Sequence, residues 1–273
     1  PASAHALTLP DLADSPVPLG LDPQSDRPDC PDHWRPFTVD AAAIHEAGGT
    51  DVLELATFAA MTADAFRTHG SSVQSQISTL FAVGPDAHLN IVKLRAARRI
   101  YSAISVAFGV ETPALPVHAI TSHRMMQDRD AWTNMLRTMS GGFGAIAGGA
   151  DYVTVRPFTD TPDERHLGEA TPFGYRIARN QQLLMMEESH LGQVCDPAYG
   201  SYFHEHMTDR LAKAAWQKFQ QIEGQGGMGH YRRNGDLETD CQAAVSARTE
   251  RADPILGVTL HPSNDVPAPE VRS

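Results

Sequence analysis

Apolar positions along the central part of the chain follow two different spacings. Short apolar runs that are typical of buried strands occupy residues 37–44, 77–83, 115–120 and 152–155. Apolar residues that recur every three or four positions predict helices over residues 51–69, 87–108, 131–147, 173–189 and 208–223. The predicted order is therefore a strand followed by a helix, repeated along the chain, with an extra helix at the end.

The first predicted helix has clear signals at both ends. Thr50 or Asp51 is placed to cap its start, and Glu54 is placed to complete a capping box. Gly70 follows the last apolar position and is expected to end the helix. These signals favour a true strand–helix alternation over a continuous helical region.

Strands that alternate with helices predict a parallel sheet with right-handed crossovers. Two architectures fit this order: a doubly wound open sheet, and a β/α barrel of the TIM type, of which four strand–helix units are half. No strand is followed by GxGxxG or by a P-loop, and the glycines of residues 141–144 lie inside a helical pattern. The sequence therefore offers no phosphate cradle of either kind.

The two ends of the chain differ from its centre. Residues 1–36 hold eight of the 19 prolines and show neither spacing, so we expect an extended arm or linker there. Residues 261–273 are similar in composition and are expected to form a disordered tail. The predicted division is an arm at 1–36, a half barrel with C-terminal helices at 37–260, and the tail.

Composition narrows the classes of partner. The net charge of -11 argues against a protein that binds nucleic acid through a basic face, and it gives no attraction to anionic membranes. No apolar run approaches the ~18 residues of a spanning helix. The cysteines are few and widely spaced, at Cys30, Cys195 and Cys241, which fits neither a disulfide framework nor a CxxC metal site. We expect a cytoplasmic protein without nucleic-acid or membrane partners.

Three arginines form the most conspicuous charged group. Arg95, Arg98 and Arg99 lie on one predicted helix within the run KLRAARR. They could contact the phosphates of a ligand such as coenzyme A, because guanidinium groups bind phosphate in a bidentate manner. The simpler interpretation is a basic stripe that faces solvent or an interface.

The histidines of the sequence do not indicate an active site. His118 lies in a predicted strand, where a barrel would aim it at the lumen, but a core histidine is more often simply hydrogen-bonded than catalytic. The run His204, Glu205, His206 lacks the further ligands that a zinc site needs. The residues alone therefore predict no catalytic group and no metal ligand set.

Longer strings resemble the methylmalonyl-CoA mutase family. Residues 90–104, NIVKLRAARRIYSAI, are similar to its IAKLRAARRLW helix. Residues 173–227, which begin FGYRIARNQQ and contain EES, DPAYGSY and IEGQGG, resemble another of its signatures. The HEAG of residues 45–48 and the HAITS of residues 118–122 match further family strings in the same order. The resemblance covers about residues 37–260.

This resemblance implies a barrel that works in a pair of chains. Some members pair a catalytic chain with a non-catalytic small subunit, and both contain a β/α barrel followed by a cobalamin domain. The present sequence is similar to the small subunit in three places. Ala43 stands where the catalytic chain has a histidine, Ile120 stands where it has a glutamine, and residues 150–158, ADYVTVRPF, differ from the catalytic SLHTNA. By the same alignment, His45 falls where small subunits have a histidine and is expected, like His118, to face the lumen.

The resemblance leaves three functions open. The leading hypothesis is a small-subunit-like, non-catalytic partner of a catalytic mutase chain, which would itself hold adenosylcobalamin. The first alternative is one half of a split-barrel mutase that is active only with its complementary half. The second is an acyl-CoA-binding module that uses Arg95 and its neighbours. We expect the chain to bind no cofactor itself and to pair with another chain or with its own copy, because strand edges at Phe37 and Tyr152 would be open.

Overall fold

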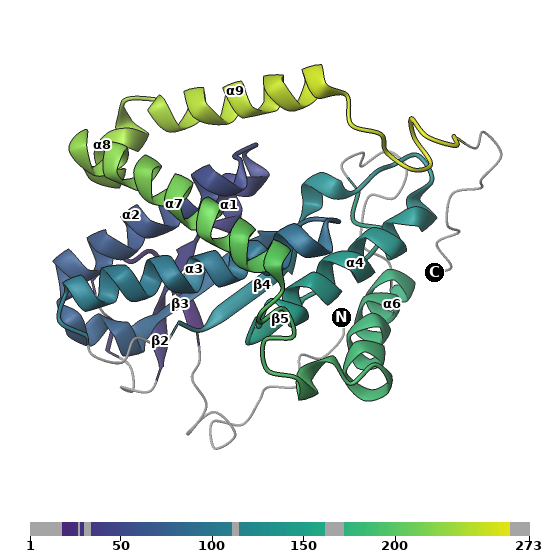
Figure 1. Cartoon of the computed structure of the whole chain (residues 1–273), viewed down its shortest axis with the longest axis horizontal. Coiled ribbons are helices and arrows are strands. Elements are labelled where there is room, and N and C mark those ends of the chain that lie inside the picture. The colour runs from purple at the N-terminus through teal and green to yellow at the C-terminus, as the bar shows by residue number, and fades with distance from the viewer. Residues whose placement is uncertain (1–17, 27, 30–33, 111–114, 162–171, 263–273) are drawn as a thin grey trace.

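A parallel sheet forms the centre of the protein. The computed structural model describes residues 18–26, 28–29, 34–110, 115–161 and 172–262. Five parallel strands follow one another in chain order across the sheet (Figure 1). They are β1 (Pro18–Leu21), β2 (Arg35–Asp40), β3 (Ile77–Val83), β4 (Val117–Thr121) and β5 (Tyr152–Thr154).

Helices connect the strands and then cover them. The connecting helices are α1 (Ala42–Glu46), α2 (Asp51–His69), α3 (Ala87–Ala107) and α4 (Asn134–Ala147). After β5 come α6 (Pro172–Leu183), α7 (Tyr202–Gly224), α8 (Gly227–Arg233) and α9 (Asp236–Arg251). A π-helical turn at Leu184–Glu188 follows α6, and short 3₁₀ turns occupy Ser71–Gln76, His123–Met125, Ala131–Thr133 and Leu191–Gln193.

The hydrophobic core lies between one face of the sheet and the helices. Phe37, Phe81 and Val117 point from the strands into this core, and Phe58 and Phe66 meet them from α2. Helix α2 is buried along almost its whole length because α7 packs against its outer side, as it does against α3 (Figure 1). The helices therefore form two layers over this face.

The opposite face of the sheet is open and partly polar. Leu80 of β3 lies beside His118 of β4, and Ile120 of β4 lies beside Thr154 of β5. These side chains are partly buried or exposed, and together with Thr38 they belong to the face that a closed barrel would turn toward its lumen. The architecture is thus α/β with a parallel sheet, consistent with part of a TIM-like barrel as the sequence predicted.

Several element boundaries differ from the sequence prediction. The first predicted strand stops at Asp40, because residues 42–46 form α1 instead. The Phe37 strand is not an edge, since β1 pairs with it from within the segment expected to be an arm. Helix α7 begins before Thr208, so that His204 and its neighbours lie on a helix. Helix α9 was not predicted, and the tail expected after residue 261 lies almost wholly outside the described residues.

Candidate functional site

A group of polar side chains lies where the central strands end. Helix α1 follows β2, Gly84 follows β3, and Ser122 follows β4. Because all the strands are parallel, their carboxyl ends meet at one edge of the sheet, which is where parallel α/β proteins build their sites. This edge is therefore the expected position of a functional site.

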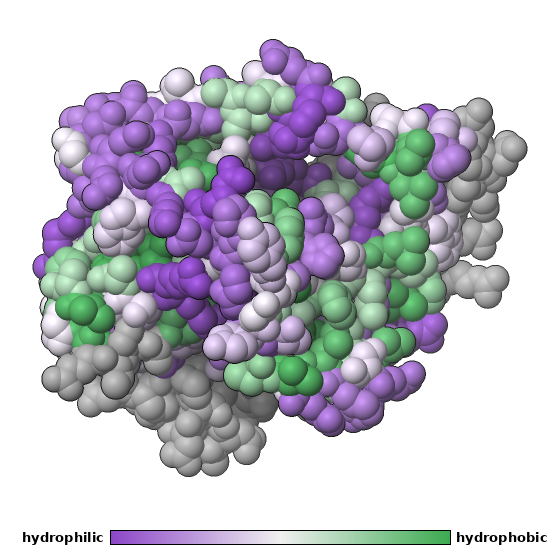
Figure 2. Space-filling model, viewed as in Figure 1, coloured by the Kyte–Doolittle hydropathy of each residue, from purple (hydrophilic) through white to green (hydrophobic). Residues whose placement is uncertain are grey.

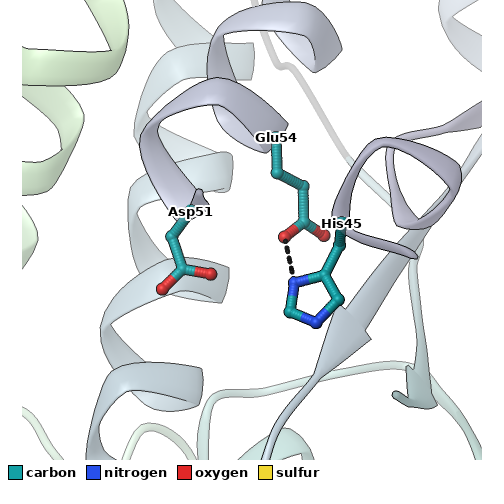
Figure 3. Close-up of side chains that lie close together, drawn as sticks. All are labelled: His45, Asp51 and Glu54. Carbon is teal, nitrogen blue, oxygen red and sulfur yellow. Dashed lines mark ion pairs between the residues drawn. The ribbon is translucent and has the colours of Figure 1, made fainter. Parts of the chain in front are cut away.

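His45 is the central ring of this group. The ring is only 6% exposed, and its Nε2 lies 3.0 Å from Ser122 Oγ. On its other side, Nδ1 lies 3.4 Å from a carboxylate oxygen of Glu54 (Figure 3). The Asp40 carboxylate accepts a hydrogen bond from the backbone of Ala43 and thereby starts the short helix that places His45.

Glu54 and Lys93 form a buried ion pair beneath His45. Both side chains are almost fully buried, and Lys93 Nζ donates to Glu54 at 2.8 Å and to Asp51 at 3.0 Å. The second oxygen of Glu54 accepts from the backbone N–H of Ala82 on β3. The capping-box prediction for Glu54 is therefore wrong: Thr50 alone caps α2 through Leu53 N–H, and Glu54 points into the core instead.

The pKa values of Asp51 and Lys93 show how strongly their charges interact. Burial alone would raise the pKa of Asp51, but attraction to the Lys93 ammonium outweighs it and holds that pKa below 3.8. Burial alone would lower the pKa of Lys93, but Asp51 and Glu54 raise it above 10.5. Asp51 and Lys93 are thus both charged at neutral pH.

The same residues include a set of metal-ligand types. Ligand atoms of His45, Asp51 and Glu54 lie within 4.8 Å of one another, and three such groups are enough for some zinc sites. Here the Lys93 ammonium contacts both carboxylates and supplies the positive charge that a cation would bring. The donor set therefore fits an ammonium-centred structural network.

Arg124 ties the loop after β4 to this network. Its guanidinium donates to the backbone carbonyls of His45 at 2.5 Å and Gly49 at 3.1 Å. The Glu46 carboxylate accepts in return from the backbone N–H groups of His123 and Arg124. These contacts fix Ser122 opposite His45, and Ser122 Oγ also accepts from the backbone N–H of Arg124.

The three arginines singled out in the sequence lie away from this edge. Arg95 donates to Glu205 at 2.6 Å and to Asp196 at 3.1 Å. Arg98 and Arg99 form ion pairs with Asp151 and Glu205, respectively. Arg95 and Arg99 thus join α3 to the start of α7 through carboxylates of the same chain.

The two histidines expected in a lumen lie in different places. His118 faces the open side of the sheet, where its Nε2 lies 2.7 Å from Thr154 Oγ1 and borders a cavity of about 540 Å³. His45 instead borders a second cavity of about 550 Å³ at the strand ends. The structure therefore does not bring the two rings into one site.

We predict that His118 titrates below its ordinary value of 6.5, because burial disfavours the charged ring and lowers its pKa. The folded state then prefers the neutral ring. Its contribution to stability is present above pH 6.5 and is lost as the pH falls through the folded pKa. An NMR titration of the ring, assigned by the resonance lost in His118→Gln, measures this. A midpoint at or above 6.5 would contradict it.

The comparison with known proteins decides the family. The family model described as methylmalonyl-CoA mutase matches residues 29–269. The chain belongs to the methylmalonyl-CoA mutase family. The sequence resemblance is thereby confirmed over a range close to the one expected from its strings.

Relatives within the methylmalonyl-CoA mutase family include several small subunits. The probable methylmalonyl-CoA mutase small subunit of Mycobacterium tuberculosis H37Rv is 41% identical over 243 residues, which is 86% of this chain and 40% of the relative. The small subunit of Streptomyces virginiae is 41% identical over 84% of this chain and 38% of its own length. The methylmalonyl-CoA mutase of Escherichia coli K12 is 34% identical over 70% of this chain and 25% of its own length. The chain thus spans about two fifths of the small subunits it matches.

Two polar side chains at the start of α3, Asp86 and His88, have partners within the protein. Asp86, in the string DAHLNI, caps α3 by accepting from Leu89 N–H at 3.0 Å. His88 lies 3.0 Å from a ring nitrogen of His204. Both side chains are thus held by contacts within the protein. Within the described residues, no helix meets the length and hydrophobicity of a membrane span.

Proposed function

We propose that this chain acts as the second half of the barrel of a small, non-catalytic mutase subunit. The supporting observation is the 41% identity to small subunits over 86% of the chain. In this proposal the catalytic partner holds adenosylcobalamin and interconverts methylmalonyl-CoA and succinyl-CoA. The present chain supports that partner without contacting the reacting atoms.

The residues on the open face of the sheet and at the carboxyl ends of its strands are consistent with this role. Ile120, on the open face of β4, offers no hydrogen bond to a substrate, and its neighbour Thr154 has no acid or base function at neutral pH. His45 and Glu54 are used within the network around Lys93 and Ser122. His118 lies on the same open face, beside Thr154.

The position of His118 favours the alternative of a split barrel. The ring borders the open sheet face, and its neutral form is favoured, as a general base requires. A complementary half barrel that paired with β1 and β5 would enclose it in a lumen. In that case His118 would contact the substrate and would be essential.

One experiment separates the two proposals. The chain is co-expressed with a catalytic mutase subunit encoded beside it, and the purified material is assayed for conversion of methylmalonyl-CoA and for mass by light scattering. We expect the chain alone to be inactive and the mixture to elute as an active complex. Turnover by the chain alone would overturn the non-catalytic assignment.

His118→Gln in the same complex provides the discriminating variant. The non-catalytic role predicts an unchanged rate, whereas a general base in a split barrel contributes about 10²–10⁴-fold. His206→Gln on the exposed part of α7 is the matched control, because it removes a histidine that borders neither cavity. A loss of rate confined to His118→Gln would favour the split barrel.

A further inference from the structure

A cavity at the strand ends has an unusual charge. It has a volume of about 550 Å³ and lies between the loop after β4, the start of α4 and residues 253–256, beside the end of α9. Figure 2 shows the surface hollowed beneath the C-terminal end of α9. Three arginines from three elements line it: Arg124, Arg137 and Arg248.

None of these arginines has a carboxylate partner within ion-pair distance among the described residues. Arg124 donates to backbone carbonyls, as described above, and Arg248 donates to the carbonyl of Gly48 at 2.7 Å. Arg137 donates to the side-chain amide of Asn134 at 2.7 Å and to the carbonyl of Leu256 at 2.6 Å. Some arginines elsewhere in the described chain, such as Arg67 and Arg95, are instead bound by carboxylates.

The carboxylates around the cavity are held by other groups. Asp253 belongs to the lining, but Arg251 binds both of its oxygens at 2.8 Å. Asp130, on the α4 side, accepts from the Thr133 hydroxyl at 2.6 Å. The Glu46 carboxylate accepts from two backbone N–H groups. Among the residues that line the cavity, three arginines stand against one carboxylate, Asp253, so the lining carries an excess of positive charge.

This arrangement is costly without an anion. Arg137 is only 9% exposed, and burial removes much of the water that would solvate its charge. Burial and repulsion by Arg248 lower the pKa of Arg124, and attraction to Glu46, Asp51 and Glu54 offsets only part of this. An oxyanion between the guanidinium groups would replace the lost hydration and cancel the repulsion.

The apolar residues of the lining indicate what the uncharged part of the ligand is like. Apolar side chains form one wall of the cavity: Met125, Leu136, Pro254, Ile255 and Leu256. A volume of this size suits a small molecule. We propose that the cavity binds a small organic anion, in which a phosphate or carboxylate meets the arginines and a short apolar body meets this wall. The proposal is independent of the mutase-subunit function.

Calorimetric titration of the full chain tests the site with named probes. The probes are phenyl phosphate, benzoate and inorganic phosphate, with benzylamine as a cation of similar size. We expect saturable binding of phenyl phosphate or benzoate, and whichever binds more tightly identifies the preferred oxyanion. Inorganic phosphate should bind more weakly because it lacks the apolar body. The net charge of -11 opposes general attraction of anions, so binding would report this cavity. Failure of every anion to bind wild type would overturn the proposal.

Two substitutions locate the binding. Arg248→Gln should weaken it about tenfold or more, since a hydrogen bond to a charged group is worth ~1.5–3 kcal/mol. Arg210→Gln removes the same charge from the exposed side of α7 and should leave the affinity unchanged. Thermal unfolding of both variants shows that each is folded, and Arg248→Lys should recover part of the affinity. Equal affinities for Arg248→Gln and Arg210→Gln would also overturn the proposal.

Discussion

Replacing Lys93 with Met should remove about 3–5 kcal/mol from the free energy of unfolding. Lys93 is 1% exposed and binds two carboxylates, one of which, Glu54, is fully buried. Without the ammonium, Glu54 would be left as a buried charge beside His45, and it holds Ala82 of β3. The loss would therefore combine an uncompensated charge with a loosened contact between α2 and the sheet.

Urea denaturation at pH 7 measures this effect. Lys213→Met is the matched control, because Lys213 is 72% exposed and pairs only with Asp209 one turn earlier, so that its loss should cost no more than about 1 kcal/mol. A second variant that combines Lys93→Met with Glu54→Gln should recover part of the stability. Equal stability of Lys93→Met and Lys213→Met would show that the buried network is dispensable.

The pKa shifts of Lys93 and Asp51 determine why the urea denaturation is done at pH 7. Because the pKa of Lys93 is raised, its contribution is complete below 10.5 and is lost as the pH rises through the folded value. Because the pKa of Asp51 is lowered, its contribution is present above 3.8 and is lost as the pH falls through the folded value. Neutral pH lies inside both ranges, so the variants report the whole network.

Gly144→Ala should destabilise the protein by about 1–3 kcal/mol, although alanine favours helices. A Cβ at this position would lie 2.8 Å from the carbonyl oxygen of Ala87 and 2.9 Å from Asn90 Cβ. Both neighbours belong to α3 near its start, where Asn90 also holds the backbone of Gly84. Helices α3 and α4 would have to move apart, which would disturb the loop after β3.

Gly224→Ala provides the control for this prediction. Gly224 is the last residue of α7, and a Cβ there would meet nothing within 4 Å. We expect a neutral or slightly stabilising effect of up to about 1 kcal/mol. Thermal unfolding of the two variants gives the comparison. If both substitutions changed the stability equally, the close approach of α3 and α4 would not be the reason why residue 144 is glycine.

The apolar spacing predicted most of the sheet because buried strands leave a strong local signal. The runs at 77–83 and 152–155 became β3 and β5 with small changes at their ends. The strand β1 left no such signal, since its four residues, PLGL, depend on pairing with β2. Helix α9 was missed because its sequence is largely polar, with Leu237 and Cys241 as its buried positions.

The candidate site was less visible than the fold. Lysine and glutamate are usually solvent-exposed, so the sequence does not single out Lys93, and it places Glu54 at the helix cap. The sequence does carry one signal: Glu54 stands between Leu53 and Leu55 in a stretch of small and apolar residues, and every position from Leu53 to Ala60 is buried. Arg124 and Arg248 are 124 residues apart in sequence, and only the tertiary fold brings them to one cavity.

The packing of α7 on α2 also sets an order of events during synthesis. Arg67 of α2 binds Glu223 at the end of α7, and 156 residues separate the two. At ~5–20 residues per second, the ribosome delivers Glu223 roughly 8–30 s after Arg67. During that interval the outer side of α2 has no native cover, and its apolar surface is open to chaperones or to neighbouring nascent chains. Closing so long a loop also slows refolding in vitro compared with proteins built from local contacts.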